Sequence, residues 1–346
     1  MTDTPTTPPP RHSRKGLFAP VGIALIALTL WTGWWIFLVR TVETRLVERV
    51  EALREAGWDV QYADLNLSGW PFRVRAEARH VELVAPSGQA IAAPELAAEA
   101  MAWNPDRWVL VASDGLVLTR GDKGKVAVEA RGIRASASGL RNPYPNLALE
   151  LVDANFTAHP GAEPFPISAA ERIEFYVRPH AEGRDGGRAV AQPDTAPIDA
   201  ADVLFRLIEA RGRREGPVEA MAQDQTLTLE VEGVVENARR LSGSDPAGVL
   251  AAWARSGGAL SDVRGRLAAG RSEATFDSPR LVAGEDGRLE GRLTLTANRP
   301  GAAISGLTGQ PAAERMPERD VALSVEFAEG RTRLGPFVLA PAPKLF

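Results

Sequence analysis

The chain has 346 residues, a formal net charge of −4 and no cysteine. Without cysteine it can form no disulfide, thiolate metal site or cysteine nucleophile. A mildly acidic chain with scattered charges also lacks the basic face that nucleic-acid binding requires. Hydrophobic residues make up 45% of the sequence, which is enough for a packed core.

Residues 1–16 are rich in Pro and Thr and show no apolar periodicity, so we expect a disordered cytoplasmic tail. Residues 17–39, LFAPVGIALIALTLWTGWWIFLV, contain no charged residue. At about 1.5 Å per residue this run spans roughly 35 Å, which matches a bilayer and predicts a transmembrane anchor. The alternatives are a buried core helix, which the lack of any polar face disfavours, and a cleaved signal peptide. Its apolar run would be shorter, about 7–15 residues, and would end in a small-x-small motif.

Trp31, Trp34 and Trp35 lie near the far end of this run. Amphipathic rings favour the headgroup level of a bilayer, so we expect these three residues at the membrane interface. Basic residues flank both ends of the run, and their number does not decide its orientation. The short tail and the large polar body favour an inner-membrane, single-pass protein with a cytoplasmic N-terminus and a periplasmic body.

Residues 40–57 predict a juxtamembrane helix that ends at a glycine. Val42, Leu46, Val50 and Leu53 form one apolar stripe along it. The stripe could be a coiled-coil seam, or it could pack on the sheet of the same protein. It covers too few heptads for a coiled coil, which favours the second alternative.

From residue 58 the apolar residues recur at every second position, which is typical of strands. Residues 58–180 predict a first β-rich half, and residues 200–346 predict a second one. Between them, residues 181–199 are rich in Gly, Pro and Asp, and we expect a linker or mobile loop. Within the second half the apolar spacing predicts a helix over residues 200–213. Asp245 as an N-cap and Ser256-Gly257-Gly258 as a stop predict a second helix over residues 246–255.

Alternation with a polar outer face is typical of antiparallel sheets that are covered on one side. We therefore expect an α+β fold that is mainly antiparallel β. One or more long curved sheets would carry a few helices on the concave face, with one transmembrane helix before them.

The most distinctive motif is Gly69, Trp70, Pro71 and Phe72, because a proline interrupts the strand pattern there. It could be a tip that contacts lipid or a partner. The favoured alternative is a structural turn with both aromatic rings buried.

The four histidines show no metal-ligand spacing, and no nucleophile can be tied to a base by motif. We therefore expect no metal, no cofactor and no enzymatic activity.

Several segments carry a family resemblance: a helix ending in Gly-Trp, then SGWPFRV, APELAAEAMAWNP and the closing EFAEGRTRLGPFVLAPAPKL. With the N-terminal anchor, they resemble an uncharacterised bacterial family of unknown function whose members are membrane-anchored periplasmic proteins. The chain is also similar in style to AsmA-like envelope proteins, whose β-rich grooves are implicated in lipid movement. That second likeness concerns the fold alone.

These observations favour a membrane-anchored protein of envelope maintenance. Its partners would be the lipid bilayer and a lipid or other hydrophobic ligand held on an apolar sheet face. The alternative is a non-enzymatic scaffold that binds a protein partner through sheet edges or the juxtamembrane helix.

Overall fold

A computed structural model describes residues 15–142, 145–180, 199–222, 225–241, 246–299 and 321–345. The predicted cytoplasmic tail (residues 1–16) and the predicted linker (residues 181–199) lie outside the described residues, apart from residues 15, 16 and 199.

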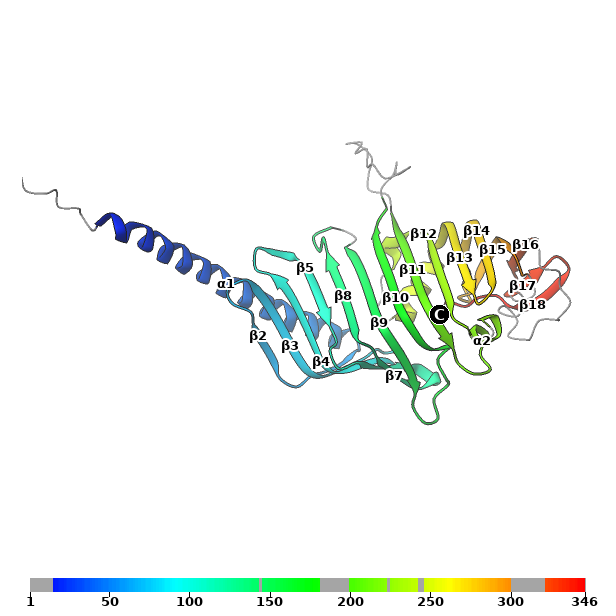
Figure 1. Cartoon of the computed structure of the whole chain (residues 1–346), viewed down its shortest axis with the longest axis horizontal. Coiled ribbons are helices and arrows are strands. Elements are labelled where there is room, and N and C mark those ends of the chain that lie inside the picture. Colours follow the sequence, from blue (N-terminus) through cyan, green and yellow to red (C-terminus); the bar gives the residue numbers. More distant parts are fainter. Residues whose placement is uncertain are drawn as a thin grey trace, which may run out of the picture.

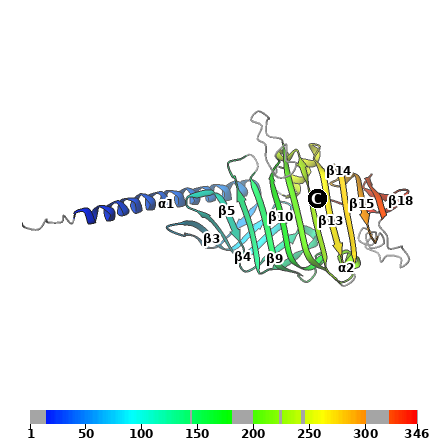
Figure 2. The ribbon, with the colours of Figure 1, turned by 45° about the horizontal axis from the view of Figure 1, so that its top comes forward.

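One helix, α1 (Lys15–Glu55), contains both the predicted anchor and the predicted juxtamembrane helix. Its 41 residues correspond to about 60 Å. Among the described residues this is the one helix long and apolar enough to cross a membrane. It ends where Gly57 adopts a left-handed conformation with φ +89°. The N-terminal half of α1 projects beyond the sheet, and its C-terminal half lies against it (Figures 1 and 2).

The described residues form one antiparallel sheet of 18 strands. Its first edge has two short strands that pair with different parts of β3, and β5 and β6 then share the next long strand, β4, as a neighbour. β8 and β7 continue from them and share β9 in the same way. The strands of this half are β1 (Asp59–Gln61), β2 (Leu65–Ser68), β3 (Arg73–Val84), β4 (Gln89–Met101), β5 (Asn104–Val111), β6 (Leu116–Arg120), β7 (Lys125–Glu129), β8 (Gly132–Ser138), β9 (Asn146–Ala158) and β10 (Ile167–Pro179).

The sheet continues without a break into the second half, because β10 pairs with β11 and Phe175 lies opposite Phe205. Each later strand pairs with the one before it. These strands are β11 (Ala200–Gly212), β12 (Leu227–Glu236), β13 (Ala259–Ala269), β14 (Ser272–Ala283), β15 (Leu289–Ala297), β16 (Val321–Ala328), β17 (Arg331–Leu334) and β18 (Phe337–Pro341).

The helix predicted over residues 200–213 is wrong, because this segment is the central strand β11. The strand register shifts between Leu207 and Ala210, where Glu209 has a positive φ of 48°. Such a bulge turns Leu207 and Ala210 to the same core, although they are three residues apart. The residues that suggested a helix precede this bulge. They occupy both faces of a regular strand, with Val203 and Leu207 on one face and Leu204 and Ile208 on the other. The predicted helix over residues 246–255 is confirmed as α3 (Pro246–Arg255).

The α-helices of the described residues all pack on the same face of the sheet. Leu38 of α1 forms one buried cluster with Val74 of β3, and Trp108 of β5 packs against this cluster. The short helix α2 (Pro217–Ala222) packs on Leu207 and Leu227, and α3 places the buried Trp253 against Val235. Single-turn 3₁₀ helices are found at Gly121–Lys123 and Ala238–Arg240. The predicted fold class, a mainly antiparallel sheet with few helices and a long apolar N-terminal helix, is confirmed.

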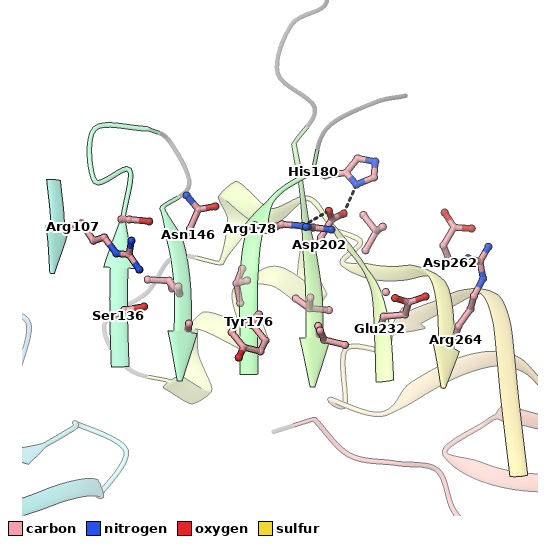
Figure 3. Close-up of a pocket in the computed structure, with 18 residues that line it drawn as sticks. Arg107, Ser136, Asn146, Tyr176, Arg178, His180, Asp202, Glu232, Asp262 and Arg264 are labelled. Carbon is pink, nitrogen blue, oxygen red and sulfur yellow. Dashed lines mark hydrogen bonds and ion pairs between the residues drawn. The ribbon is translucent and has the colours of Figure 1, made fainter. Parts of the chain in front are cut away.

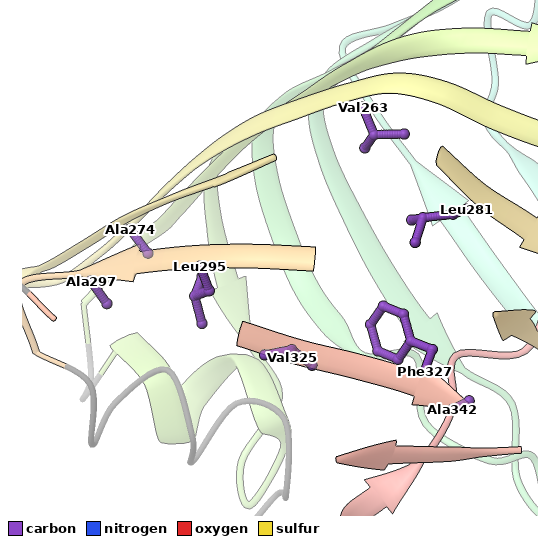
Figure 4. Close-up of a cluster of buried hydrophobic side chains, with 8 residues drawn as sticks. All are labelled: Val263, Ala274, Leu281, Leu295, Ala297, Val325, Phe327 and Ala342. Atoms are coloured by element: carbon purple, nitrogen blue, oxygen red, sulfur yellow. The ribbon is translucent and has the colours of Figure 1, made fainter. Parts of the chain in front are cut away.

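At its far end the sheet curls around a hydrophobic core that includes the C-terminal segment (Figure 4). Val325 is almost completely buried there, and the ring of Phe327 fills the space beneath Leu281. The apolar face is therefore the inner side of this curl. The buried members of the cluster are Val263, Ala274, Leu281, Leu295, Ala297, Val325, Phe327 and Ala342.

Candidate functional site

The helix-bearing face of the sheet carries a continuous row of apolar residues, which we call the apolar lane. Its members lie directly opposite one another on successive strands from β2 to β16, so their side chains share one face. At about 4.8 Å per strand the lane is roughly 55–60 Å long. It consists of Leu67, Ala76, Ala98, Leu110, Ala135, Leu149, Phe175, Phe205, Val231, Gly265, Phe276, Leu295 and Leu323.

Two further apolar rows flank the lane across the central strands, so the apolar surface is several residues wide. Two residues further along each strand lie Ile133, Leu151, Ile173, Leu207 and Leu229. Two residues in the other direction lie Trp108, Ala137, Leu147, Val177 and Val203.

Both ends of the lane are covered, and its centre is open. α1 packs over Leu67 at one end, and the curled strands β13–β16 enclose Leu295 at the other. Between these covers the sheet exposes four large apolar side chains, which we call the central strip. Each is between 37% and 43% exposed, which is unusual for leucine and phenylalanine in the middle of a sheet. The central strip consists of Leu110, Leu147, Leu149 and Phe175.

The opposite face is polar and contains an open groove of about 810 Å³ that runs from β5 to β13 (Figure 3). The groove carries charges of both signs, with Tyr176 near its middle. Partial burial raises the pKa of the Tyr176 phenol above its ordinary value, and the neighbouring Glu174 adds to this effect. The other charged and titratable residues that line the groove are Arg107, Arg178, His180, Asp202, Glu232, Asp262 and Arg264.

A histidine–carboxylate pair lies at one end of this groove. The Nδ1 atom of His180 is 2.5 Å from the Oδ1 atom of Asp202, and Nε of Arg178 is 2.9 Å from the other oxygen (Figure 3). A His–acid pair is two parts of a hydrolytic triad. Among the described residues, however, no hydroxyl is hydrogen-bonded to His180. Since Arg178 also binds the carboxylate, the arrangement is that of a cross-strand ion pair at the end of β10 and β11.

A ladder of cross-strand ion pairs crosses the middle of the polar face. Glu174 is buried between Arg172 and Arg206, and Arg206 also donates to Glu230 at 2.8 Å. Charged pairs of this kind suit a solvated face. The sheet is therefore amphipathic across its central strands, with ion pairs on one side and exposed leucines on the other.

The motif Gly69–Phe72 forms the turn between β2 and β3. Gly69 has φ +105°, and a Cβ atom at this position would lie 2.7 Å from the Arg73 carbonyl oxygen. The bond between Trp70 and Pro71 is cis. Trp70 and Phe72 are 50% and 61% exposed, so the prediction that their rings are buried is wrong. The space on the inner side of the turn is filled by side chains from α1 instead.

The three tryptophans of α1 all donate hydrogen bonds to the sheet body. The indole N–H of Trp31 donates to the Pro71 carbonyl at 2.8 Å, and that of Trp35 donates to the Arg73 carbonyl at 2.7 Å. Trp34 donates to the carbonyl of Ala102 at 3.2 Å and stays 44% exposed. These residues therefore dock the helix on the first strands. Their predicted position at the membrane interface stays a prediction.

Sequence reasoning missed two parts of this surface. Trp103 lies beside the Phe72 ring in the two-residue turn between β4 and β5, and an aromatic residue next to Asn104-Pro105 is the signal that could have indicated it. The central strip was visible only as alternation in Leu147, Leu149 and Phe175. Alternation shows which side chains share a face, but not which of them a helix covers.

Comparison with known proteins gives a family and no function. No curated protein and no solved structure matches the chain, so its likeness to AsmA-like envelope proteins stays a prediction. One family model matches residues 35–343, from Trp35 of α1 to just beyond the last strand. The chain therefore belongs to the bacterial family described as "Uncharacterized protein conserved in bacteria (DUF2125)".

Proposed function

We propose that this protein binds the acyl chains of membrane lipids on its apolar lane and serves in maintenance of the bacterial envelope without catalysis. The observation that carries the proposal is the central strip, four exposed large apolar side chains in the open middle of the lane and its flanking row. Exposed contiguous apolar surface of this kind is typical of binding sites. In the proposed arrangement α1 anchors the chain in the inner membrane and the sheet body lies in the periplasm.

The energetics favour an apolar chain as the ligand. Each methylene group that leaves water contributes about 0.8 kcal/mol, so even a short contact along the strip would be stabilising. The strip runs across the strands from Leu110 on β5 to Phe175 on β10, about 14 Å at the usual strand spacing. An extended chain can follow such a row, and a lipid headgroup can remain in water at the margin of the sheet.

The anchor supports a lipid over other apolar ligands. α1 is apolar enough to cross a bilayer, and its middle residues pack in the cluster of Val74 beside the first residues of the lane. The lane therefore begins next to the segment that is proposed to lie in the membrane. A ligand drawn from the bilayer would reach the central strip over apolar surface.

The test measures lipid that co-purifies with the full-length protein. We expect wild-type protein to carry lipid, detected by mass spectrometry after extraction, and the variant Leu149→Asn with Phe175→Asn to carry several-fold less. Tyr176→Asn is the matched control because Tyr176 neighbours Phe175 and is similarly exposed, but faces the polar groove. Equal lipid in all three proteins, or none in wild type, would count against the proposal.

The scaffold alternative has one observation in its favour. The edge strand β18 exposes Phe337 and Val338, and exposed apolar edges are surfaces on which partner strands add. The stripe of the juxtamembrane helix is a weaker candidate, because Val42 packs against the body of the same protein. Crosslinking that recovers one stoichiometric protein partner, with lipid absent, would favour the scaffold.

A further inference from the structure

An exposed cluster of aromatic residues, which we call the aromatic seat, surrounds the point where α1 meets the sheet. Each of its side chains is between 44% and 61% exposed. They come from three places: α1, the β2–β3 turn and the β4–β5 turn. The members of the aromatic seat are Trp34, Phe37, Trp70, Phe72 and Trp103.

Direct contacts hold the three parts of the seat together. The backbone N–H of Ala102 donates to the Phe72 carbonyl at 2.9 Å and so joins the two turns. The rings of Phe72 and Trp103 meet edge to face with centroids 6.3 Å apart. The indole N–H of Trp70 donates to the Thr32 hydroxyl of α1 at 3.3 Å. The seat is thus a fixed surface at one level of the helix.

The length of the helix relates this level to the membrane. From residue 17 to residue 30, before the docking tryptophans, the helix rises only about 20 Å, whereas a hydrocarbon core is about 30 Å thick. From residue 17 to Phe37 it rises about 32 Å. A bilayer that matches the apolar run must therefore extend to the level of Trp31–Phe37. The two turns pack against α1 at this same level.

We propose that the aromatic seat is immersed in the headgroup–acyl boundary of the bilayer that α1 crosses, so that the sheet body rests on the membrane. Tryptophan and phenylalanine rings favour this boundary, and the indole N–H groups of Trp34 and Trp70 already have partners. The immersion is shallow, because Arg73 follows Phe72 directly and pairs with Glu99 at 3.3 Å. Those charged groups belong in water or among headgroups.

Immersion of the aromatic seat in the bilayer would fix the orientation of the whole sheet relative to the membrane. The β2–β5 end of the body would meet the bilayer and the β18 end would point away from it, in the arrangement of Figure 1. This inference does not depend on lipid binding by the central strip.

The absence of native cysteine allows a direct test by single-cysteine spin labelling. Full-length Phe72→Cys and Trp103→Cys proteins are labelled and reconstituted in vesicles of phosphatidylcholine and phosphatidylglycerol. Accessibility to oxygen and to a water-soluble nickel chelate then gives the depth of each label. Phe337→Cys is the control, because Phe337 is also an exposed ring beside a turn but lies at the far end of the sheet.

We expect the labels at positions 72 and 103 to favour oxygen over nickel at least several-fold more than the label at position 337. Nickel accessibility equal to that at position 337 would overturn the proposal. Should either variant fail to fold, brominated lipids provide a second measurement. Trp103→Phe should then remove part of the quenched tryptophan fluorescence, and an unchanged quenched fraction would also overturn the proposal.

Discussion

Gly69 is the residue on which the β2–β3 turn depends. Its φ of +105° is rare for residues with a Cβ atom, and its hydrogen atom faces the Arg73 carbonyl. The backbone N–H of Arg73 donates back to the Gly69 carbonyl at 2.9 Å, which closes the turn. The positions of Trp70 and Phe72 in the aromatic seat follow from this conformation.

Gly69→Ala should therefore destabilise the protein more than a glycine substitution that is strained by φ alone. Gly88→Ala is the control, since Gly88 has φ +80° and an added Cβ atom there would have no neighbour within 4 Å. We expect the Gly69 variant to lose roughly 1–3 kcal/mol more unfolding free energy, because its Cβ also meets a backbone oxygen. Thermal unfolding of both variants measures the difference, and equal melting temperatures would contradict it.

Glu236 and Arg280 provide a pH-dependent contribution to stability. The hydrogen bond from Arg280, 3.0 Å from Nη2 to Oε2, is the main cause that lowers the pKa of the Glu236 carboxyl below its ordinary value. A carboxyl with a lowered folded pKa stabilises the fold above its unfolded pKa, and this contribution disappears as the pH falls through the folded pKa.

Arg280→Met should accordingly destabilise the protein near pH 6, and the deficit should shrink at a pH below the folded pKa of Glu236. Urea unfolding at several pH values between 6 and 3 measures this trend. Glu236→Gln should behave in the same way, because either change removes the pair. A deficit that stays constant across the range would show that packing, rather than the charge, is responsible.

Helix α1 has two parts with different surroundings, which meet at Trp31. Before this residue, the side chains of residues 18–30 are exposed, as expected of a membrane span. After Trp31, towards the C-terminal end of the helix, Leu38 is 7% exposed and packs with Val74 and Ala102. The apolar helix and the sheet body are therefore one structural unit. The predicted boundary between anchor and juxtamembrane helix at residue 39 lies inside this packed region.

Leu38→Ala should weaken the docking of α1 on the first strands by about 2–4 kcal/mol, because it leaves a cavity in this cluster. Leu30→Ala is the control on the same helix, since Leu30 is 70% exposed. Hydrogen exchange in lipid nanodiscs is the measurement. Faster exchange in β2 and β3 is expected for Leu38→Ala alone, and equal exchange in both variants would contradict docking at this site.

Local patterns predicted most elements, and tertiary features caused the errors. Alternation was sufficient for strands such as β9 and β15, and the cap and stop residues at its two ends were sufficient for α3. Helical spacing gave the wrong element at β11, because apolar residues occupy both faces of this strand, Leu207 on one and Leu204 and Ile208 on the other. The exposed rings of Trp70 and Phe72 could not be predicted either, because their exposure depends on tryptophans about 40 residues away.

At the scale of the whole molecule, the sheet joins both halves through β10 and β11. Phe175 lies opposite Phe205 and Val177 opposite Val203, so the junction is as fully paired as the interior of either half. Pairing between strands distant in sequence leaves no local signal, which is why the sequence suggested two halves without indicating one sheet.

Cutting the chain at this junction should therefore not separate the halves. With a protease site inserted between Arg188 and Ala189, we expect the two cleaved fragments to elute together in size-exclusion chromatography in detergent. The backbone hydrogen bonds and side-chain contacts between β10 and β11 hold the fragments together, so the covalent connection is not needed. Fragments that separate under native conditions would contradict a continuous sheet.

The proposed function requires that one face of this long sheet holds lipid and the other does not. Phe175 and Tyr176 test this difference within a single strand, since they are neighbours with exposures of 39% and 37% on opposite faces. A photo-crosslinking amino acid replaces each in turn in the full-length protein, and adducts are identified by mass spectrometry after irradiation of intact cells. We expect lipid adducts at position 175 and none at position 176. Equal adducts at both positions, or none at position 175, would contradict lipid binding on the apolar lane.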